Sequence, residues 1–217
     1  TMSNKTTVAS ETGTNLIRRD FLRATAFYAA ATASTNVFAE ILEQTASMTE
    51  GPFYPDKLPL DTDNDLLIIN DKIDRGIGEV THLSGKILDI NGAPIRNAVV
   101  EIWQTDGNGV YLHSKGGDPQ ARDANFQGFG RFATGAKGEY YFRTIQPTEY
   151  PGRTPHIHYR VVAPGQKRFS TQCFIRGHEK NTRDGLIRRL GTASESLMVD
   201  FKPLPESTIG ELTAEFN

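Results

Sequence analysis

The chain contains the stretch Leu83-Ser-Gly-Lys-Ile-Leu-Asp-Ile-Asn-Gly-Ala-Pro-Ile-Arg-Asn-Ala-Val-Val-Glu-Ile-Trp-Gln104. Its two outer parts, Leu83–Ile90 and Val99–Gln104, have the apolar and β-branched residues that are typical of strands. Asn91-Gly92 between them is the strongest short hairpin signal in the chain, although the Gly-Ala-Pro continuation also suits a wider connection. The stretch therefore predicts two strands joined by a turn.

Further strand signals follow along the chain. Polar stretches at Ser114–Asn125 and Gly177–Ile187 predict loops or short helices around an opening. The 217 residues include 20 glycines and 11 prolines, which suits many short strands joined by turns. We therefore expect one all-β domain, a sandwich of two packed sheets with long loops around an opening. The further expected strands are Tyr140–Thr144, Ile157–Val162, Phe169–Ile175, Val199–Lys202 and Glu211–Phe216.

Composition excludes some classes of partner. The formal net charge is -2 at pH 7, so the chain does not have the character of a basic nucleic-acid binder. Hydrophobic residues make up 37% of the chain, which is enough for one sizeable core. Cys173 is the only cysteine, so the fold has to hold without an internal disulfide.

Two histidines and two tyrosines are the strongest candidates for chemistry. His156 and His158 stand two residues apart on an expected strand, so their side chains project from one face, with Cα atoms roughly 7 Å apart. Tyr150 and Tyr111 would have to arrive from loops. Imidazole suits several first-row metals, whereas phenolate is a hard anionic oxygen that favours a small, highly charged ion. This donor set favours Fe(III) over zinc or copper.

Each part of this group also has an ordinary structural explanation. A His-x-His pair on a strand is more often structural or incidental, and most tyrosines are half-buried packing groups whose hydroxyl finds a partner. A zinc or copper site for hydrolysis or storage also stays open from the histidine pair. Two tyrosine ligands are, however, atypical of those metals.

From Leu83 to Tyr111 the chain closely resembles the intradiol ring-cleavage dioxygenases, the non-haem Fe(III) enzymes that include protocatechuate 3,4-dioxygenase and catechol 1,2-dioxygenase. The resemblance includes the glycines and the Val-Glu-Ile sequence that precedes the first tyrosine. It extends over about residues 48 to 205, including Thr49–Tyr54, which is similar to the segment that leads into the family's fold. The other matching segments are Gly128–Arg131, Gly138–Ile145 and Tyr150–His158.

The resemblance implies a metal centre and roles for its neighbours. The implied protein ligands of a non-haem Fe(III) ion are Tyr111, Tyr150, His156 and His158. Arg153 and Gln172 match the arginine and glutamine of the family's active site, where they would act next to the iron ligands or on substrate charge. Without the resemblance, a surface arginine and a strand glutamine would be the preferred interpretation.

The resemblance also implies a reaction. A catechol-type substrate would chelate the iron, and Tyr150 would take one of its protons as the internal base. Both atoms of O2 would enter the aromatic ring, which opens between the two hydroxylated carbons to a cis,cis-muconate. A positive Arg153 beside the developing charge fits electrostatic stabilisation. The chain does not identify its catechol, and a homo-oligomer stays open.

The N-terminus carries a separate signal. Arg18-Arg19 and the alanine-rich run Ala24–Ala39 resemble a twin-arginine export signal, and an ordinary amphipathic helix is the alternative. The run is too short and too polar for stable membrane insertion. We therefore expect residues 1–39 to be a signal peptide and flexible N-terminus, recognised by the twin-arginine export machinery. Residues 45–217 would be the catalytic domain of a periplasmic or extracellular protein.

Two observations concern what the resemblance leaves open. Only five residues separate Tyr150 from His156, where protocatechuate dioxygenases carry a longer insertion with a tryptophan, so one pocket wall is expected to differ. A secreted transthyretin-like β-sandwich that binds without catalysis would share the strand pattern of Gly85–Ile102. Such a module would not need the four ligands.

Overall fold

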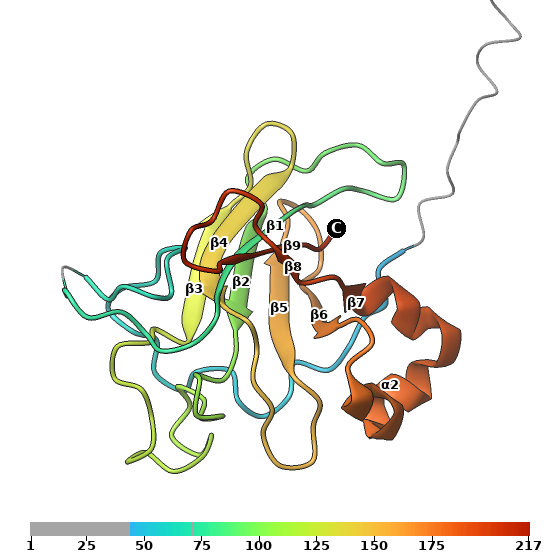
Figure 1. Cartoon of the computed structure of the whole chain (residues 1–217). Helices are drawn as coiled ribbons and strands as arrows, with labels where there is room; N and C mark the ends of the chain where they lie inside the picture. The colour runs from blue at the N-terminus through green and yellow to red at the C-terminus, as the bar shows by residue number, and fades with distance from the viewer. Residues whose placement is uncertain (1–43, 71) are drawn as a thin grey trace, which may run out of the picture. The chain divides into compact units, whose positions relative to one another are not determined.

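The computed structural model describes residues 44–70 and 72–217 (Figure 1). The expected signal peptide at residues 1–39 lies outside the described residues and stays a prediction. No helix within the described ranges combines the length and the apolar character that a membrane span requires.

Nine strands within the described residues form two sheets (Figure 1). The four-stranded sheet has the order β4-β1-β9-β8, and the five-stranded sheet has the order β3-β2-β5-β6-β7. The strands of the first sheet are β4 (Glu139–Ile145), β1 (Val80–Lys86), β9 (Leu212–Glu215) and β8 (Lys202–Pro203). Those of the second are β3 (Phe129–Ala133), β2 (Val99–Trp103), β5 (His156–Val162), β6 (Phe169–Ile175) and β7 (Met198–Val199).

Alternation along the strands separates the core from the other face of the five-stranded sheet. On β2, Val100 and Ile102 are fully buried in the main hydrophobic cluster, whereas Trp103 belongs to a second cluster. Because side chains of neighbouring residues point to opposite faces, Trp103 and Glu101 share the face away from the core. This second face of the sheet carries the candidate site.

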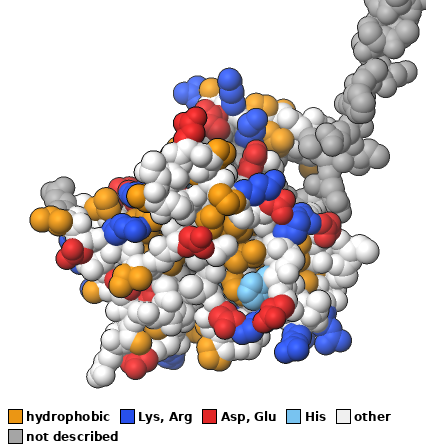
Figure 2. Space-filling model, viewed as in Figure 1, with side chains coloured by type: hydrophobic (Ala, Val, Ile, Leu, Met, Phe, Trp, Pro, Cys, Tyr) orange, Lys and Arg blue, Asp and Glu red, His pale blue; other side chains and the backbone are white. Residues whose placement is uncertain are grey.

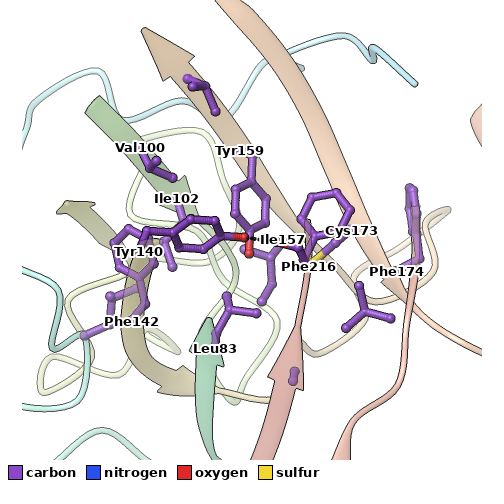
Figure 3. Close-up of a cluster of buried hydrophobic side chains, with 14 of the residues drawn as sticks. Leu83, Val100, Ile102, Tyr140, Phe142, Ile157, Tyr159, Cys173, Phe174 and Phe216 are labelled. Atoms are coloured by element: carbon purple, nitrogen blue, oxygen red, sulfur yellow. Dashed lines mark hydrogen bonds between the residues drawn. The ribbon is translucent and has the colours of Figure 1, made fainter. Parts of the chain in front are cut away.

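The core lies between the two sheets (Figure 3). Leu83 and Phe142 from the four-stranded sheet pack with Ile102 and Ile157 from the five-stranded sheet, and all four side chains are fully buried. Burying an aliphatic or aromatic side chain of this size contributes about 1.5–3 kcal/mol. This shared core makes the sandwich a stable platform for residues on its other face.

A short helical segment stands beside the β6 and β7 strands (Figure 1). It consists of η1 (Glu179–Arg183), α2 (Gly185–Leu190) and η2 (Gly191–Leu197). Asp184 begins α2 as its N-cap, because its carboxylate accepts hydrogen bonds from the backbone N–H groups of Leu186 and Ile187.

Charges on the described residues are mixed in sign. Figure 2 shows Lys and Arg side chains beside Asp and Glu side chains on the face in view. Some of the opposite charges on the described residues form ion pairs, such as Arg143 with Asp65 at 2.9 Å.

The expectation of an all-β two-sheet sandwich is confirmed, and of the two alternatives for the Asn91-Gly92 segment the hairpin is wrong and the wider connection is correct. β1 pairs with β4 and β9, whereas β2 pairs with β3 and β5, so the two strands belong to different sheets. The turn itself exists, because Asp89 accepts hydrogen bonds from the backbone of Asn91 and Ala93. The wider Gly-Ala-Pro connection carries the chain from one sheet to the other.

Two other strand expectations differ from the structure. The run expected at Val199–Lys202 is split between β7 and β8, which lie in different sheets. β3 was not expected, since its glycine and arginine hide the strand pattern in Phe-Gly-Arg-Phe-Ala. Ser114–Asn125 is a loop, and Gly177–Ile187 is largely the start of the helical segment.

Candidate metal centre

His156 and His158 lie at the start of β5, on the face away from the core. Each is 1% exposed. The register of the sheet places His158 opposite Trp103 on β2 and opposite Gln172 on β6. The expectation that both imidazoles share one face is therefore confirmed, and their Nε2 atoms lie 3.1 Å apart.

Tyr111 joins the two imidazoles from a loop that follows β2. Its hydroxyl oxygen lies 3.3 Å from Nε2 of His156 and 3.1 Å from Nε2 of His158. Three donor atoms thus form a triangle with sides of 3.1–3.3 Å. Ligands bound at right angles about 2.1 Å from one first-row ion would lie roughly 3 Å apart, so this spacing fits a shared metal ion.

Local backbone structure holds the Tyr111 loop. The buried Asp106 carboxylate accepts hydrogen bonds from the backbone N–H groups of Asn108 and Val110. Tyr111 N then donates to Gly116 O at 2.9 Å. A Cβ atom at Gly116 would lie 2.4 Å from Cβ of Tyr111, so this close approach requires glycine.

Tyr150 lies next to the other three residues. Its ring centroid is 5.3 Å from that of Tyr111 and 5.6 Å from that of His156. Tyr111 is 2% exposed, whereas Tyr150 is only partly buried and borders a surface cavity. The four sequence-predicted ligands therefore come together, with Tyr150 as the member that solvent can reach.

The histidines are held in the neutral form that a metal ligand requires. Nδ1–H of His156 donates to the carbonyl oxygen of Thr154 at 2.6 Å, which leaves the Nε2 lone pair facing the cluster. Burial, with a smaller contribution from the positive charge of Arg153, lowers the pKa of His156 to about 3. Burial and the neighbouring His156 likewise lower the pKa of His158 well below its ordinary value.

Tyr111 has the opposite requirement. Burial, followed by the nearby Tyr150, raises the pKa of the Tyr111 phenol well above its ordinary value of 10.0. A phenolate at neutral pH therefore needs a strong positive charge at this position. A trivalent ion supplies more of that charge than a divalent one.

The donor set restricts which metal chemistry fits. Nowhere in residues 44–70 and 72–217 do three or more His, Cys, Asp or Glu side chains gather as a metal site. The phenols of Tyr111 and Tyr150 are the side chains beside His156 and His158 that could add oxygen donors to such a site. Two neutral imidazoles with two phenolates match the expected Fe(III) set better than the usual ligands of zinc.

Arg153 and Gln172 lie together beside the four residues. Arg153 Nη2 donates to Oε1 of Gln172 at 2.8 Å, and Gln172 Nε2 donates to the carbonyl oxygen of Thr49 at 3.0 Å. Arg153 Nε donates to Oδ2 of Asp184 at 2.7 Å. The arginine is thus held from two sides, with its side chain 16% exposed.

A cavity of about 460 Å³ opens beside Tyr150 and Arg153. Asp184, Lys180 and Arg183 complete its helical side. A volume of this size is within the range that accommodates small organic ligands. A second cavity of about 370 Å³, bordered by Arg176 and Lys202, contains none of the candidate residues.

Sequence reasoning missed three residues that contact the site. Trp103 stacks on His158, Phe53 stacks on Tyr111 at 4.9 Å, and Asp184 binds Arg153. Asp184 carried a usable signal, since an aspartate before an apolar run is typical of a helix N-cap. The two aromatic contacts depend on tertiary packing and had no local signal.

Comparison with known proteins places this geometry in context. Residues 49–204 match the family model described as Dioxygenase. The chain is 35% identical over 133 residues to the protocatechuate 3,4-dioxygenase beta chain of Burkholderia cepacia, which covers 52% of this chain and 57% of that protein. It is 30% identical over 146 residues to hydroxyquinol 1,2-dioxygenase of Nocardioides simplex. That match covers 59% of this chain and 46% of the relative. The chain spans about half the length of these curated relatives.

Solved structures show the same fold. The dioxygenase domain of a dioxygenase and carbohydrate-binding protein fusion from Streptomyces sp. SirexAA-E is 27% identical, with a TM-score of 0.61. That match covers 79% of this chain and 94% of the other. Catechol 1,2-dioxygenase from Acinetobacter sp. ADP1 is 25% identical with a TM-score of 0.63, covering 88% of this chain and 66% of that one.

Proposed function

Because this chain belongs to the intradiol ring-cleavage dioxygenase family, we propose that it is a non-haem Fe(III)-dependent enzyme that opens a catechol-type ring. Both atoms of O2 would enter the ring, and cleavage between the two hydroxylated carbons would give a cis,cis-muconate. The observation that carries the proposal is the convergence of Tyr111, His156 and His158 within 3.1–3.3 Å, with Tyr150 beside them.

The four residues would hold the ion as neutral imidazoles and phenolates. Bound Fe(III) would supply charge that stabilises the phenolates, and it would draw electron density from a catecholate so that the ring can react with O2. Thr154 fixes the His156 tautomer, because its carbonyl oxygen accepts the Nδ1 proton. This hydrogen bond would keep Nε2 free to bind the ion.

Tyr150 and Tyr111 would have different roles. Tyr150 is partly exposed and borders the 460 Å³ cavity, so it can accept a proton from a substrate hydroxyl there. Tyr111 is 2% exposed and stacked against Phe53, so it would remain a fixed ligand that water does not reach. One of the two catechol protons would therefore move to the phenolate oxygen of Tyr150.

Arg153 would stabilise negative charge that develops on the substrate. Its guanidinium borders the same cavity as Tyr150, and Asp184 and Gln172 fix its direction. A preorganised cation of this kind is most effective where water is excluded. Gln172 would act as its positioning partner rather than as a group that reacts.

A sandwich that binds without catalysis is not favoured. Such a module would have no need for two imidazoles and two phenols in contact on one face of its sheet. The named relatives of this chain are dioxygenases for catechol, hydroxyquinol and protocatechuate. We propose residues 45–217 as the catalytic domain, since the described residues belong to one compact unit and the family match lies within it.

The test is oxygen uptake by the ferric protein with catechol, protocatechuate and hydroxyquinol, with the products identified. We expect one O2 consumed per ring opened and a muconate product from at least one substrate. The yellow semialdehyde of extradiol cleavage would contradict the proposal. Tyr150→Phe, which removes the proposed proton acceptor, should slow the same reaction.

The cellular location is a separate proposal. Arg18-Arg19 and the alanine-rich run after them support export by the twin-arginine route to the periplasm or the exterior. That route carries folded proteins, so the metal would be bound before export.

A further inference from the structure

The segment Thr49–Tyr54, here called the strap, crosses the outer face of the five-stranded sheet beside the metal centre. A Cβ atom at Gly51, where φ is +74°, would lie 3.2 Å from Cε1 of His158. Phe53 stacks on Tyr111 and meets Tyr150 edge to face at 5.8 Å. The strap therefore contacts both proposed tyrosine ligands and one of the histidines.

His158 differs from His156 in how its ring is held. Nδ1 of His156 bonds to Thr154 O, but Nδ1 of His158 has no hydrogen-bonding partner among the described residues, although it is buried. A metal-bound histidine usually donates this second N–H to a carboxylate, a carbonyl or water, which orients the ring. Something other than a protein hydrogen bond must orient His158.

Trp103 is the group in contact with that ring. The two rings are stacked, with centroids 4.8 Å apart and planes 8° from parallel. Trp103 and His158 are direct cross-strand neighbours on β2 and β5, the arrangement in which aromatic pairs interact most closely. The plane of the indole therefore determines the plane in which the imidazole can lie.

Tyr54 holds the indole from the strap. Its ring meets Trp103 edge to face, with centroids 5.1 Å apart and planes at 83°. Edge-to-face contact of this kind is favourable and directional. The orientation of Trp103 is therefore tied to the position of Tyr54.

An ion-pair network fixes Tyr54. The Arg160 guanidinium lies over the Tyr54 ring, 3.8 Å from its centroid, and donates to the Tyr54 hydroxyl. Arg160 Nε also donates to Glu101 Oε2 at 2.6 Å, and Arg160 Nη1 to Glu50 Oε1 of the strap at 3.0 Å. The Glu101 side chain is 5% exposed and binds Arg131 through its other oxygen at 2.6 and 2.9 Å.

Strand geometry places this network one step from the metal centre. Glu101 and Arg160 are cross-strand neighbours, as are Trp103 and His158, and the two pairs are two residues apart on the same strands. With a period of two, both pairs project from the same face. The charged pair and the stacked pair therefore form consecutive rows.

We propose that Glu101, Arg160 and Tyr54 are positioning residues of the metal centre. The network holds Tyr54 against Trp103, and Trp103 in turn sets the plane of the His158 imidazole. This inference rests on the proposed function, because it assigns what directs one of the proposed iron ligands. A purely structural role for the network would stabilise the sheet without affecting His158.

Trp103 makes the first step measurable without metal, because it is the only tryptophan in the 217 residues. Tyr54→Leu and Arg160→Lys should change the near-ultraviolet circular dichroism and the emission of Trp103 in the metal-free protein. Tyr54→Phe keeps the ring against Trp103 and under the Arg160 guanidinium but loses the hydroxyl's bonds to Arg160 and Glu101, so its signal should lie between those of the wild type and Tyr54→Leu. Arg143→Lys is the matched control, since Arg143 forms a comparable 2.9 Å ion pair with Asp65 on the four-stranded sheet.

The second step is tested by titrating each protein with ferric nitrilotriacetate and following the quenching of Trp103 emission. Loss of a residue that orients a metal ligand typically weakens affinity about 10- to 100-fold, which is the loss we expect for Tyr54→Leu and Arg160→Lys. Arg143→Lys should bind iron as the wild type does, even where it lowers the melting temperature by as much as the network variants. Tyr54→Phe, which keeps the ring, should lose less affinity than Tyr54→Leu.

Two results would overturn the inference and are distinct from failure of the proposed function. One is an unchanged Trp103 signal in Tyr54→Leu and Arg160→Lys. The other is wild-type iron affinity in those variants despite a changed Trp103 signal. If the wild-type protein took up no Fe(III), the proposed function would fail first, and the inference with it.

Discussion

Oδ2 of Asp184 lies 2.7 Å from Nε of Arg153, and the same carboxylate caps helix α2. Asp184 Oδ1 accepts from the backbone N–H groups of Leu186 and Ile187 at 2.9 and 3.2 Å, while Oδ2 also accepts from Thr154 N. One fully buried side chain thus links the start of the helix to the arginine beside the candidate metal centre. The helix, the arginine and the backbone next to His156 should respond together when Asp184 changes.

Asp184→Asn should therefore lower the stability of the fold and also loosen the position of the Arg153 side chain. Asparagine is still a good N-cap, so the main loss is the charged partner of Arg153. Removing one partner of a buried pair typically costs about 3 kcal/mol or more, which urea unfolding at pH 7 can measure. Asp89→Asn, in the exposed turn between the sheets, is the control and should cost much less.

The same pair predicts a pH dependence of stability. Burial opposes ionisation of Asp184, but the hydrogen bond and the charge of Arg153 outweigh it and lower the carboxyl pKa below its ordinary 3.8. A lowered folded-state pKa stabilises the fold above the unfolded pKa, and this contribution is lost as pH falls through the folded value. Wild type should thus lose more stability below about pH 4 than Asp184→Asn. Parallel unfolding curves for both proteins from pH 7 to pH 3 would contradict this.

Iron-loaded protein should be red. Charge transfer from tyrosinate to Fe(III) absorbs visible light, and the two phenols of the site, Tyr111 and Tyr150, would be the donors. Tyr111→Phe should shift or weaken the band, and removal of iron by a chelator should abolish it. Tyr141→Phe, on β4 of the other sheet, is the control that should keep the wild-type spectrum. A colourless protein with stoichiometric ferric iron would refute the tyrosine ligands.

His158→Ala should lose iron and activity together. Its Nε2 atom is 3.1 Å from both Tyr111 Oη and His156 Nε2, so its loss removes one donor of the proposed set. His82→Ala, on β1 of the other sheet, should retain iron. Metal content by mass spectrometry compares the two variants. Full ferric iron in His158→Ala would mean that this imidazole is not a ligand.

The sequence predicted local features better than contacts between distant segments. Same-face projection of His156 and His158 follows from strand alternation alone, and the structure has it. The hairpin alternative for the segment after Leu83 was wrong because the turn signal at Asn91-Gly92 predicts a reversal of chain direction. It does not predict which strands pair with each other. The stacking of Trp103 on His158 could not be predicted for a similar reason, because the pairing of residues across strands depends on the whole sheet.

Export can be tested independently of catalysis. Arg18→Lys with Arg19→Lys should leave the precursor in the cytoplasm, because the twin-arginine receptor recognises the guanidinium pair and lysine lacks its planar fork. Cell fractionation of wild type and double variant measures this. The specific activity of purified enzyme should be the same for both. Equal export of the two proteins would remove the proposed location.

Arg153→Ala should slow ring cleavage while iron stays bound. The guanidinium borders the cavity next to Tyr150 and makes no contact that would hold a metal, so its loss should lower kcat without emptying the site. Losing one preorganised electrostatic contact typically costs on the order of 10²-fold in rate. Arg153→Lys keeps the charge but cannot bond to both Asp184 and Gln172 with the same fork, so we expect an intermediate rate.

The measurement for Arg153 is kcat per bound iron with catechol as substrate, with the product identified in each case. Arg188→Ala, exposed on α2, is the control and should keep the wild-type rate. Because Arg153→Ala leaves the Asp184 carboxylate buried without its cation, Arg153→Ala with Asp184→Asn should recover stability but not rate. Recovery of wild-type kcat in that double variant would show that Arg153 serves the fold and not the reaction.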